Sequence, residues 1–410
     1  MYQLLAEAAT LDRAKPLGVT IVMPCLNETI SLPHCIANAH DALRLIEDRF
    51  GLAGEIVIAD NGSTDGSQAL AESLGARVIA VPRRGYGAAL IGGCRAAYGD
   101  YILMGDCDGS YNFTEGVAMI GKLIEGHDLC MGSRFDGGIA PGAMPWKNRH
   151  IGNPALTGVL NLFFRSGIND AHCGLRAISR DAFAQLGLSG EGMEFASEMV
   201  IKASLKKMRV AQVPATLSVD LRDRAPHLRP WRDGWRHLRY LLMLSPTWVF
   251  GVPGVTAVLL AAIIFGVAGA YATGLVAGTP FFGVSWCVIA AFLATSGHFC
   301  LLMGTAMHLH GVRSGYRRLR PSIARLGQIV TLETMLVAGL ALIAVALFTL
   351  GLVGMQWTKG GFEALKDPLP LIGGAALGAI GLQTAFGAFV LAIIAGNDNR
   401  LAPAAEAAGG

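Results

Sequence analysis

The chain has 410 residues, of which 52% are hydrophobic and 15% are charged, with a net charge of +3 and a mean hydropathy of +0.46. Because a soluble domain is about a quarter charged, a wholly soluble protein is excluded. The small net charge also excludes a nucleic-acid binder with an overall basic balance. Most charged residues lie in 1–245, and apolar residues and glycine dominate 248–396. We therefore expect a soluble domain followed by a membrane domain.

The eight cysteines are scattered, and none forms a C-x-x-C pair with another. This distribution is typical of reduced, mostly buried thiols in a cytoplasmic domain, and not of a disulfide framework or a zinc site. Residues 1–18 are polar and lack an apolar stretch. We therefore expect no cleaved signal peptide and a soluble domain that stays on the side where it is made.

Strand and helix patterns alternate through the first third of the chain. Apolar runs that end in acids and turn residues indicate strands, and stretches with helical spacing separate them. The alternation predicts an α/β fold with a mostly parallel, doubly wound sheet. The predicted strands are 19–23, 55–59, 77–81, 101–105 and 128–132, and the predicted helices are 31–50, 68–74, 88–98 and 114–125.

Acidic residues follow two of these strands. The strand over 101–105 ends in Asp106 and Asp108, and the strand over 55–59 ends in Asp60. Ligands of open α/β sheets bind at the carboxyl ends of the strands. Two carboxylates there can hold a hard divalent cation, which can in turn hold a diphosphate. The pattern predicts a pocket for a nucleotide diphosphate at this edge.

The chain between the sheet and the membrane segments contains a loop and several helices. Residues 135–149 are rich in Gly, Pro and Met, and we expect a mobile loop over the site. Helices are predicted over 150–166 and 191–207. Residues 226–247 combine Trp and Arg at helical spacing, which favours a helix in the membrane interface; a solvated charged face is the alternative.

Four apolar segments follow, each long enough to span a bilayer. The link over 308–326 is rich in arginine, whereas the link over 274–281 is uncharged and the link over 356–368 is charge-balanced. By the positive-inside rule, the arginine link and both termini are expected in the cytoplasm. We predict an α/β domain over 1–225 and a disordered tail over 397–410. The predicted spans are 248–273, 282–306, 329–354 and 369–395.

The soluble part contains a series of different short motifs. They are Pro24-Cys25-Leu26-Asn27-Glu28, Asp60-Asn61-Gly62-Ser63, Arg84-Gly85-Tyr86-Gly87, Asp106-Cys107-Asp108, Gly132-Ser133-Arg134, Gly174-Leu175-Arg176 and Glu198-Met199. This ordered set resembles the GT-A-fold, family-two glycosyltransferases, specifically the polyprenyl-phosphate (dolichol-phosphate) hexose synthases, over about residues 18–245. The resemblance implies a membrane-bound, inverting hexosyltransferase that uses a nucleotide-diphosphate sugar of the UDP-glucose or GDP-mannose type. The acceptor would be a polyprenyl phosphate in the cytoplasmic leaflet.

The resemblance also implies roles for single residues. Asp106 and Asp108 would hold Mg²⁺ or Mn²⁺, with Asp106 near the sugar. Arg134 and Arg176 would face the acceptor phosphate, and Glu198 is a further catalytic candidate. The residues expected at the nucleotide are Pro24, Leu26, Asn27, Glu28, Asp60, Asn61, Arg84 and Gly85.

The chain departs from the family pattern at two places. Asn61 stands where relatives often have Asp, and Gly109-Ser110-Tyr111 stands where they often supply Gln as a metal contact. The third protein ligand of the metal is therefore not assigned. A homo-oligomer is left open, and no nucleic-acid partner is expected.

Other interpretations remain open. A glycerolipid or ceramide hydroxyl could be the acceptor, with Glu194 or Glu198 as the base that it requires. A polysaccharide-type synthase is also open, although residues 227–231 lack its Gln-x-x-Arg-Trp motif, as is a membrane scaffold or lipid translocator. Arg84 could be a surface arginine, Glu198 an ion-pair partner on a helix, and His172 a structural histidine.

Overall fold

A computed structural model describes residues 18–223, 230–277, 282–365 and 367–396. The chain divides into two compact units, Met1–Leu244 and Ser245–Gly410. The predicted tail over 397–410 lies outside the described residues. The boundary between the units falls inside the segment 226–247 that was predicted as an interface helix.

The described residues of unit 1 form a seven-stranded sheet in the order β3-β2-β1-β4-β6-β5-β7. In the described chain the pairings are parallel, except that β6 runs antiparallel to β4 and β5. The prediction of an α/β fold with a mostly parallel sheet is confirmed. The strands are β1 (Val19–Cys25), β2 (Gly54–Asp60), β3 (Arg77–Ala80), β4 (Tyr101–Met104), β5 (Leu129–Ser133), β6 (Arg176–Ser179) and β7 (Val210–Pro214).

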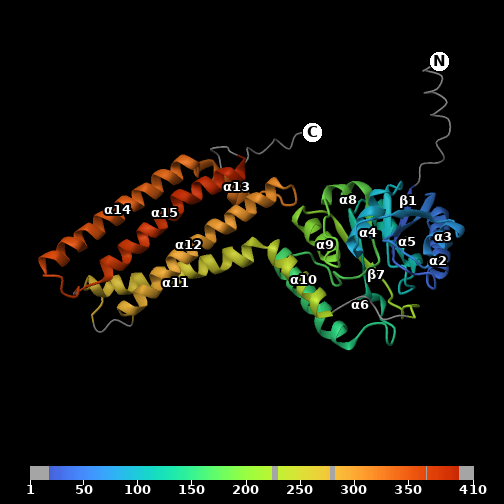
Figure 1. Cartoon of the computed structure of the whole chain (residues 1–410), viewed down its shortest axis with the longest axis horizontal. Helices are drawn as coiled ribbons and strands as arrows, with labels where there is room; N and C mark the ends of the chain where they lie inside the picture. The colour runs from blue at the N-terminus through green and yellow to red at the C-terminus, as the bar shows by residue number, and fades with distance from the viewer. Residues whose placement is uncertain (1–17, 224–229, 278–281, 366, 397–410) are drawn as a thin grey trace, which may run out of the picture. The chain divides into compact units, whose positions relative to one another are not determined.

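Helices cover both faces of this sheet (Figure 1). Ile21 and Met23 of β1 lie in the core beside α2 (Leu32–Phe50), whereas Val22 faces Gly93 of α4 (Tyr86–Arg95). A Cβ at Gly93 would come within 2.5 Å of the Val22 side chain, so only glycine allows α4 to pack this closely. Burial of each large apolar side chain stabilises the sheet by about 1.5–3 kcal/mol.

The predicted helices over 68–74, 114–125, 150–166 and 191–207 are present within a few residues of their predicted bounds. The predicted loop over 135–149 includes most of α6 (Arg134–Gly137) and an isolated bridge between Ile139 and Leu217. Besides α2 and α4, the helical elements described in unit 1 are α3 (Ser67–Ser73), η1 (Phe113–Glu115), α5 (Gly116–Ile124), α6 (Arg134–Gly137), η2 (Asn148–Gly152), α7 (Asn153–Phe164), α8 (Arg180–Leu186), α9 (Phe195–Leu205) and α10 (Pro230–Met243).

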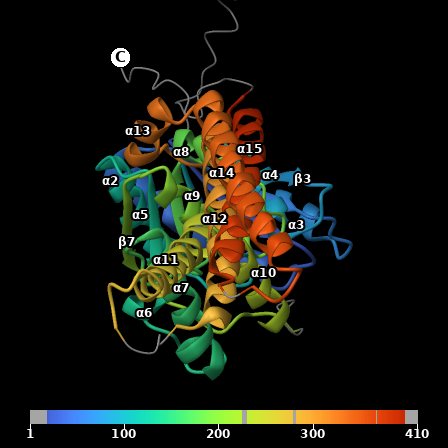
Figure 2. The ribbon, with the colours of Figure 1, turned by 90° about the vertical axis from the view of Figure 1, so that its left-hand side faces the viewer.

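Unit 2 is helical (Figures 1 and 2), and among its described residues four helices are long and apolar enough to cross a membrane. Helices α14 (Leu332–Lys359) and α15 (Leu369–Ala395) approach closely where Gly339 lies against Gly381. A Cβ at either glycine would lie 2.8 Å from the carbonyl oxygen of the other, so a side chain at these positions would prevent this close approach. Such small-residue contacts are typical of helix pairs in lipid. The elements are η3 (Thr247–Gly251), α11 (Val252–Ala272), α12 (Val284–Arg313), α13 (Pro321–Ile329), α14 (Leu332–Lys359) and α15 (Leu369–Ala395).

The helices of unit 2 extend beyond some of the predicted spans. The second span was predicted to end at 306, but α12 continues to Arg313. Arg313 Nη1 donates to the carbonyl oxygens of Ile393 (3.0 Å) and Ile394 (3.1 Å) at the end of α15. The predicted span ends at 306 because the polar residues that follow lower the hydropathy. The helix itself continues to Arg313, since its last turn gains these hydrogen bonds.

Candidate active site

A cavity of about 380 Å³ opens in unit 1 at the carboxyl ends of β1, β2 and β4. Most of the residues that the resemblance assigned to a nucleotide or metal site line it: Pro24, Leu26, Glu28, Asn61, Arg84, Gly85, Asp106 and Asp108. Arg84 is exposed but lies on the wall of this cavity. The remaining wall residues are Cys25, Tyr86, Ala89, Cys107, Gly192, Met193, Arg222, Arg232 and Arg236.

The two acids of the Asp106–Asp108 pair have different surroundings. Asp108 Oδ1 accepts hydrogen bonds from the Ser110 backbone N–H (3.0 Å) and hydroxyl (2.6 Å), which fixes the turn after β4. Asp106 is hydrogen-bonded to the hydroxyl of Tyr86. Desolvation, together with the negative charge of Asp108, raises the pKa of Asp106 to about 6. The negative charge at this position is therefore only partly compensated by the protein.

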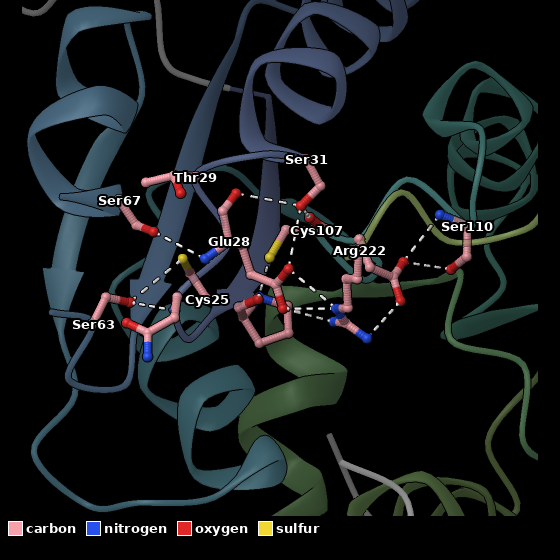
Figure 3. A network of polar contacts seen from close by, with 12 residues as sticks. Cys25, Glu28, Thr29, Ser31, Ser63, Ser67, Cys107, Ser110 and Arg222 are labelled. Atoms are coloured by element: carbon pink, nitrogen blue, oxygen red, sulfur yellow. Dashed lines mark hydrogen bonds and ion pairs between the residues drawn. The ribbon is translucent and has the colours of Figure 1, made fainter. Parts of the chain in front are cut away.

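Arg222 is a site residue that the sequence motifs did not identify. Its Nε donates to Glu28 Oε1 at 2.8 Å, and its Nη1 lies 3.1 Å from Asp108 Oδ2 (Figure 3). The segment that carries it is held over the turn after β4, because the Leu221 N–H donates to the Asp108 carbonyl at 2.8 Å. Arg222 follows β7 with no motif around it, so the sequence offered only an unassigned arginine.

The loop after β2 is shaped by Asp60 and Asn61. Desolvation opposes the charge of Asp60, but hydrogen bonds from Ser63, Gln68 and Gly62 outweigh it and lower the pKa of the carboxyl group. Asn61 Nδ2 donates to the Arg83 carbonyl (2.7 Å), and its Oδ1 accepts from the Gly85 N–H (2.7 Å). These bonds tie the loop after β2 to the turn that begins α4.

Gly85 is required by that turn. Its φ is +140°, and a Cβ would lie 2.2 Å from the Glu191 carbonyl oxygen. Asn27, with a φ of +58°, accepts from the Thr64 N–H at 2.8 Å. Asn27 and Asp60 shape the neighbouring loops but are not among the residues that line the cavity. Their contact with a nucleotide stays a prediction.

Arg134 and Arg176 lie outside the cavity lining, although an acceptor-phosphate role was expected of both. Arg134 is 7% exposed and forms a two-point ion pair with Asp170, at 2.7 and 2.8 Å. Arg176 is 2% exposed, and its guanidinium donates to the carbonyl oxygens of Cys173 and Ala196. Both guanidinium groups therefore bind internal partners that the motifs could not reveal.

Glu198 is fully buried and forms an ion pair with Lys202 at 2.7 Å. Its carboxylate also accepts from the backbone N–H of Ser189 (3.1 Å) and Gly190 (2.7 Å). The interpretation of Glu198 as an ion-pair partner on a helix is confirmed. Because it does not line the cavity, these contacts support an anchoring role, and its catalytic assignment stays a prediction.

His172 belongs to a buried chain of polar groups. Its Nε2 lies 3.2 Å from Ser197 Oγ, which in turn lies 2.8 Å from His237 Nδ1 on α10. Burial and, as the second cause, the charge of His237 lower the pKa of His172 well below its usual value. His172 is therefore a hydrogen-bonded histidine inside the domain, as expected for a structural role.

The site fits a hard divalent cation in charge and in ligand type. In the described part of the chain no group of three or more His, Cys, Asp or Glu side chains could hold a metal. Asp106 and Asp108 do supply carboxylate oxygens at the cavity, and the raised pKa of Asp106 marks a charge that a cation would compensate. Mg²⁺ is commonly held by one or two carboxylates, with water and substrate phosphate completing its shell. The third protein ligand remains unassigned.

Comparison with known proteins places the chain in a family. Residues 20–187 match the model for glycosyl transferase family 2, and residues 305–395 match the glycosyltransferase family 2 C-terminal transmembrane region. The low-salt glycan biosynthesis hexosyltransferase Agl6 of Haloferax volcanii is 34% identical over 91% of this chain and 88% of its own length.

Two further relatives match the soluble part. A dolichyl-phosphate hexose transferase of Haloferax volcanii is 27% identical over 50% of this chain and 84% of its own length. The polyprenol monophosphomannose synthase of Mycolicibacterium smegmatis is 28% identical over 48% of this chain and 76% of its own length. The chain therefore belongs to glycosyltransferase family 2, with a GT-A domain followed by that family's C-terminal transmembrane region.

Proposed function

We propose that this protein is a metal-dependent, inverting glycosyltransferase that moves a hexose from a nucleotide-diphosphate sugar to a polyprenyl phosphate in the cytoplasmic leaflet of a membrane. The observation that carries the proposal is the cavity in unit 1, where the Asp106–Asp108 pair faces arginines from different parts of the domain. Relatives named for dolichyl-phosphate hexose transfer and polyprenol monophosphomannose synthesis support the acceptor class.

The donor would bind at the carboxyl ends of β1 and β2. Glu28, Asn61 and Gly85 line this part of the cavity, and the hydrogen bonds of Asn61 hold its loops in place. A divalent cation on Asp106 and Asp108 would neutralise charge on the diphosphate leaving group. Arg222 lies 3.1 Å from Asp108, so a diphosphate beside this acid would be within its reach. The planar guanidinium suits two-point binding of phosphate oxygens.

The transfer breaks the bond between the anomeric carbon and the diphosphate oxygen. In-line attack by the acceptor oxygen from the opposite face inverts the configuration, so an α-linked donor gives a β-linked product. A phosphate monoester has a second pKa of about 6, so the acceptor is largely dianionic at neutral pH. It needs cations that orient it and no strong base.

Arg232 and Arg236 are the arginines that we assign to the acceptor phosphate. Both line the cavity and both lie on α10, the basic amphipathic helix. Helix α10 ends at Met243 and the membrane unit begins at Ser245, so along the chain the helix leads directly into the first apolar segment. Arg134 and Arg176, with their internal partners, would support the fold next to the site.

Transfer to a lipid hydroxyl is the second candidate, and one observation favours it. Glu194 Oε2 is buried and has no hydrogen-bond partner among the described residues. Glu194 follows Gly192 and Met193, which line the cavity. Oε1 of the same carboxylate accepts from the Gly192 N–H at 3.0 Å, so Oε2 is the oxygen that could accept the proton that a hydroxyl acceptor must lose.

Substitutions at Glu194 and Arg236 separate these candidates. With a phosphate acceptor, Glu194→Gln should keep turnover within about tenfold of wild type, because no proton is removed in the transition state. Arg236→Ala should raise the KM for polyprenyl phosphate at least about tenfold, and Arg236→Lys should restore it only partly because lysine lacks the planar fork. Glu125→Gln, at an exposed ion pair with Lys122, is the matched control. Loss of turnover in Glu194→Gln with a mild effect of Arg236→Ala would favour the hydroxyl acceptor.

A further inference from the structure

Two cysteines stand side by side at the donor end of the sheet. In the parallel pair of β1 and β4, Val22 lies opposite Met104, and the same register carried three residues further sets Cys25 opposite Cys107. The Gly105 N–H still donates to the Val22 carbonyl (3.3 Å), so the ladder continues past the end of β4. Neighbouring strands are about 4.8 Å apart. This spacing is within the range of about 4.4–6.8 Å between the Cα atoms of disulfide-bonded cysteines.

The Cys107 thiol lies against the backbone of the segment that carries Cys25. Cys107 Sγ donates to the carbonyl oxygen of Pro24, the residue before Cys25, at 2.7 Å (Figure 3). Cys25 Sγ lies 3.8 Å from Ser63 Oγ. The interaction of the two thiols lowers the pKa of Cys25, although burial opposes this, and raises the pKa of Cys107. A thiol with a lowered pKa is more often present as the nucleophilic thiolate.

A small oxidant can reach this pair through the cavity. Cys25 and Cys107 both line it, although they are only 2% and 1% exposed. Cys35, Cys94 and Cys130 are also buried but are not among the lining residues. The cavity therefore distinguishes this pair from those three.

We propose that Cys25 and Cys107 are a redox-sensitive pair, which hydrogen peroxide converts into a disulfide that closes the donor site. The Cys25 sulfur attacks one peroxide oxygen, the O–O bond breaks, and water leaves with the thiol proton, giving a sulfenic acid. The Cys107 sulfur then attacks the Cys25 sulfur and displaces its hydroxyl group as a second water. The two thiols lose two electrons and two protons in total, and the peroxide is reduced to two waters. In cytosolic proteins such disulfides are typically transient and redox-sensing.

The bond would change the site because of where Cys107 lies. A disulfide brings its sulfur atoms to about 2.05 Å, so Cys107 must give up its hydrogen bond to the Pro24 carbonyl. Cys107 is the residue between Asp106 and Asp108, and its displacement moves both carboxylates. A misplacement of about 1 Å in such a site costs about a hundredfold in rate. The effect on donor binding rests on the proposed function, whereas the disulfide itself does not.

The test uses the full-length protein in detergent. It is treated with hydrogen peroxide, free thiols are blocked with iodoacetamide, and peptides are analysed by mass spectrometry with and without dithiothreitol. We expect a Cys25–Cys107 link that dithiothreitol reverses, that Cys94→Ser retains and that Cys25→Ser abolishes. UDP and GDP with Mg²⁺, titrated calorimetrically, should bind the oxidised protein at least about tenfold more weakly than the same protein reduced.

Each failure has a separate meaning. Oxidation that leaves Cys25 and Cys107 unlinked, or that joins Cys107 to Cys35 or to a second chain, overturns the pair. A Cys25–Cys107 link that leaves nucleotide binding unchanged overturns its closing of the site. If the reduced protein binds neither nucleotide, the proposed function fails, while the link seen by mass spectrometry still decides the redox chemistry.

Discussion

Arg222 occupies the place next to Asp108 where a divalent cation would bind, so Arg222→Gln should tighten metal binding to the nucleotide-free protein. The arginine lies 3.1 Å from Asp108 and 2.8 Å from Glu28, and its side chain is 20% exposed. Two unit charges about 4 Å apart interact by roughly 4 kcal/mol at an effective dielectric constant of about 20. Solvent at the cavity mouth reduces this, and we expect a gain of about 1–2 kcal/mol for the cation, roughly fivefold to thirtyfold in affinity.

The same variant should impair catalysis. Arg222 would stabilise the departing diphosphate, and loss of one such donor costs about a hundredfold to a thousandfold in turnover. Arg222→Gln should therefore bind Mn²⁺ more tightly and turn over more slowly, whereas Arg222→Lys should lie between wild type and glutamine in both respects. Arg180→Gln, at an exposed pair with Asp100, is the matched control and should change neither.

The metal affinity is measured by titrating Mn²⁺ into the purified protein and following the free ion by electron paramagnetic resonance. Turnover is measured in parallel with excess metal. Unchanged or weaker Mn²⁺ binding by Arg222→Gln would refute the competition between this arginine and the cation. Normal turnover of Arg222→Gln would remove its assignment to the leaving group.

Three other predictions concern Asp108, Asp106 and the membrane topology. Asp108→Asn should lower turnover at least about a hundredfold, and near-normal activity of the wild type in EDTA would contradict a metal-dependent transfer. Because the pKa of Asp106 is raised to about 6, the folded metal-free protein holds this proton more tightly than the unfolded chain. The stabilising contribution is present at low pH and is lost as the pH rises through about 6, so urea denaturation should show Asp106→Asn to be less pH-dependent than wild type between pH 4 and 7. For the topology, a maleimide applied to intact cells should label Leu275→Cys and spare Ser314→Cys, and the reverse pattern would put the arginine link outside.

The sequence was sufficient for the features that depend on local pattern. Alternating strands and helices predicted the mostly parallel sheet, and acids after 101–105 and 55–59 predicted which edge carries the site. The apolar segments predicted the four long helices. These features are local because a strand, a turn and a span each depend on residues that are close in sequence.

Features that depend on distant contacts could not be predicted in the same way. The ion pair of Arg134 with Asp170 and the contact of Arg222 with Glu28 join residues far apart in the chain. A short motif gives a residue type and an order, but it does not say whether a guanidinium faces a cavity or an internal acid. The reversed direction of β6 likewise depends on pairing with β4 and β5, which no periodicity encodes.

Transfer to a lipid phosphate is the central claim, and product analysis tests it most directly. The purified full-length protein is incubated with Mg²⁺ or Mn²⁺, a panel of radiolabelled UDP- and GDP-sugars, and either a polyprenyl phosphate or the matching polyprenol without phosphate. We predict that label from one donor enters the lipid phase only with the phosphate, and that mild acid releases it as free sugar. Labelled lipid formed with polyprenol, ceramide or diacylglycerol, or a product that survives mild acid, would contradict a phosphate acceptor.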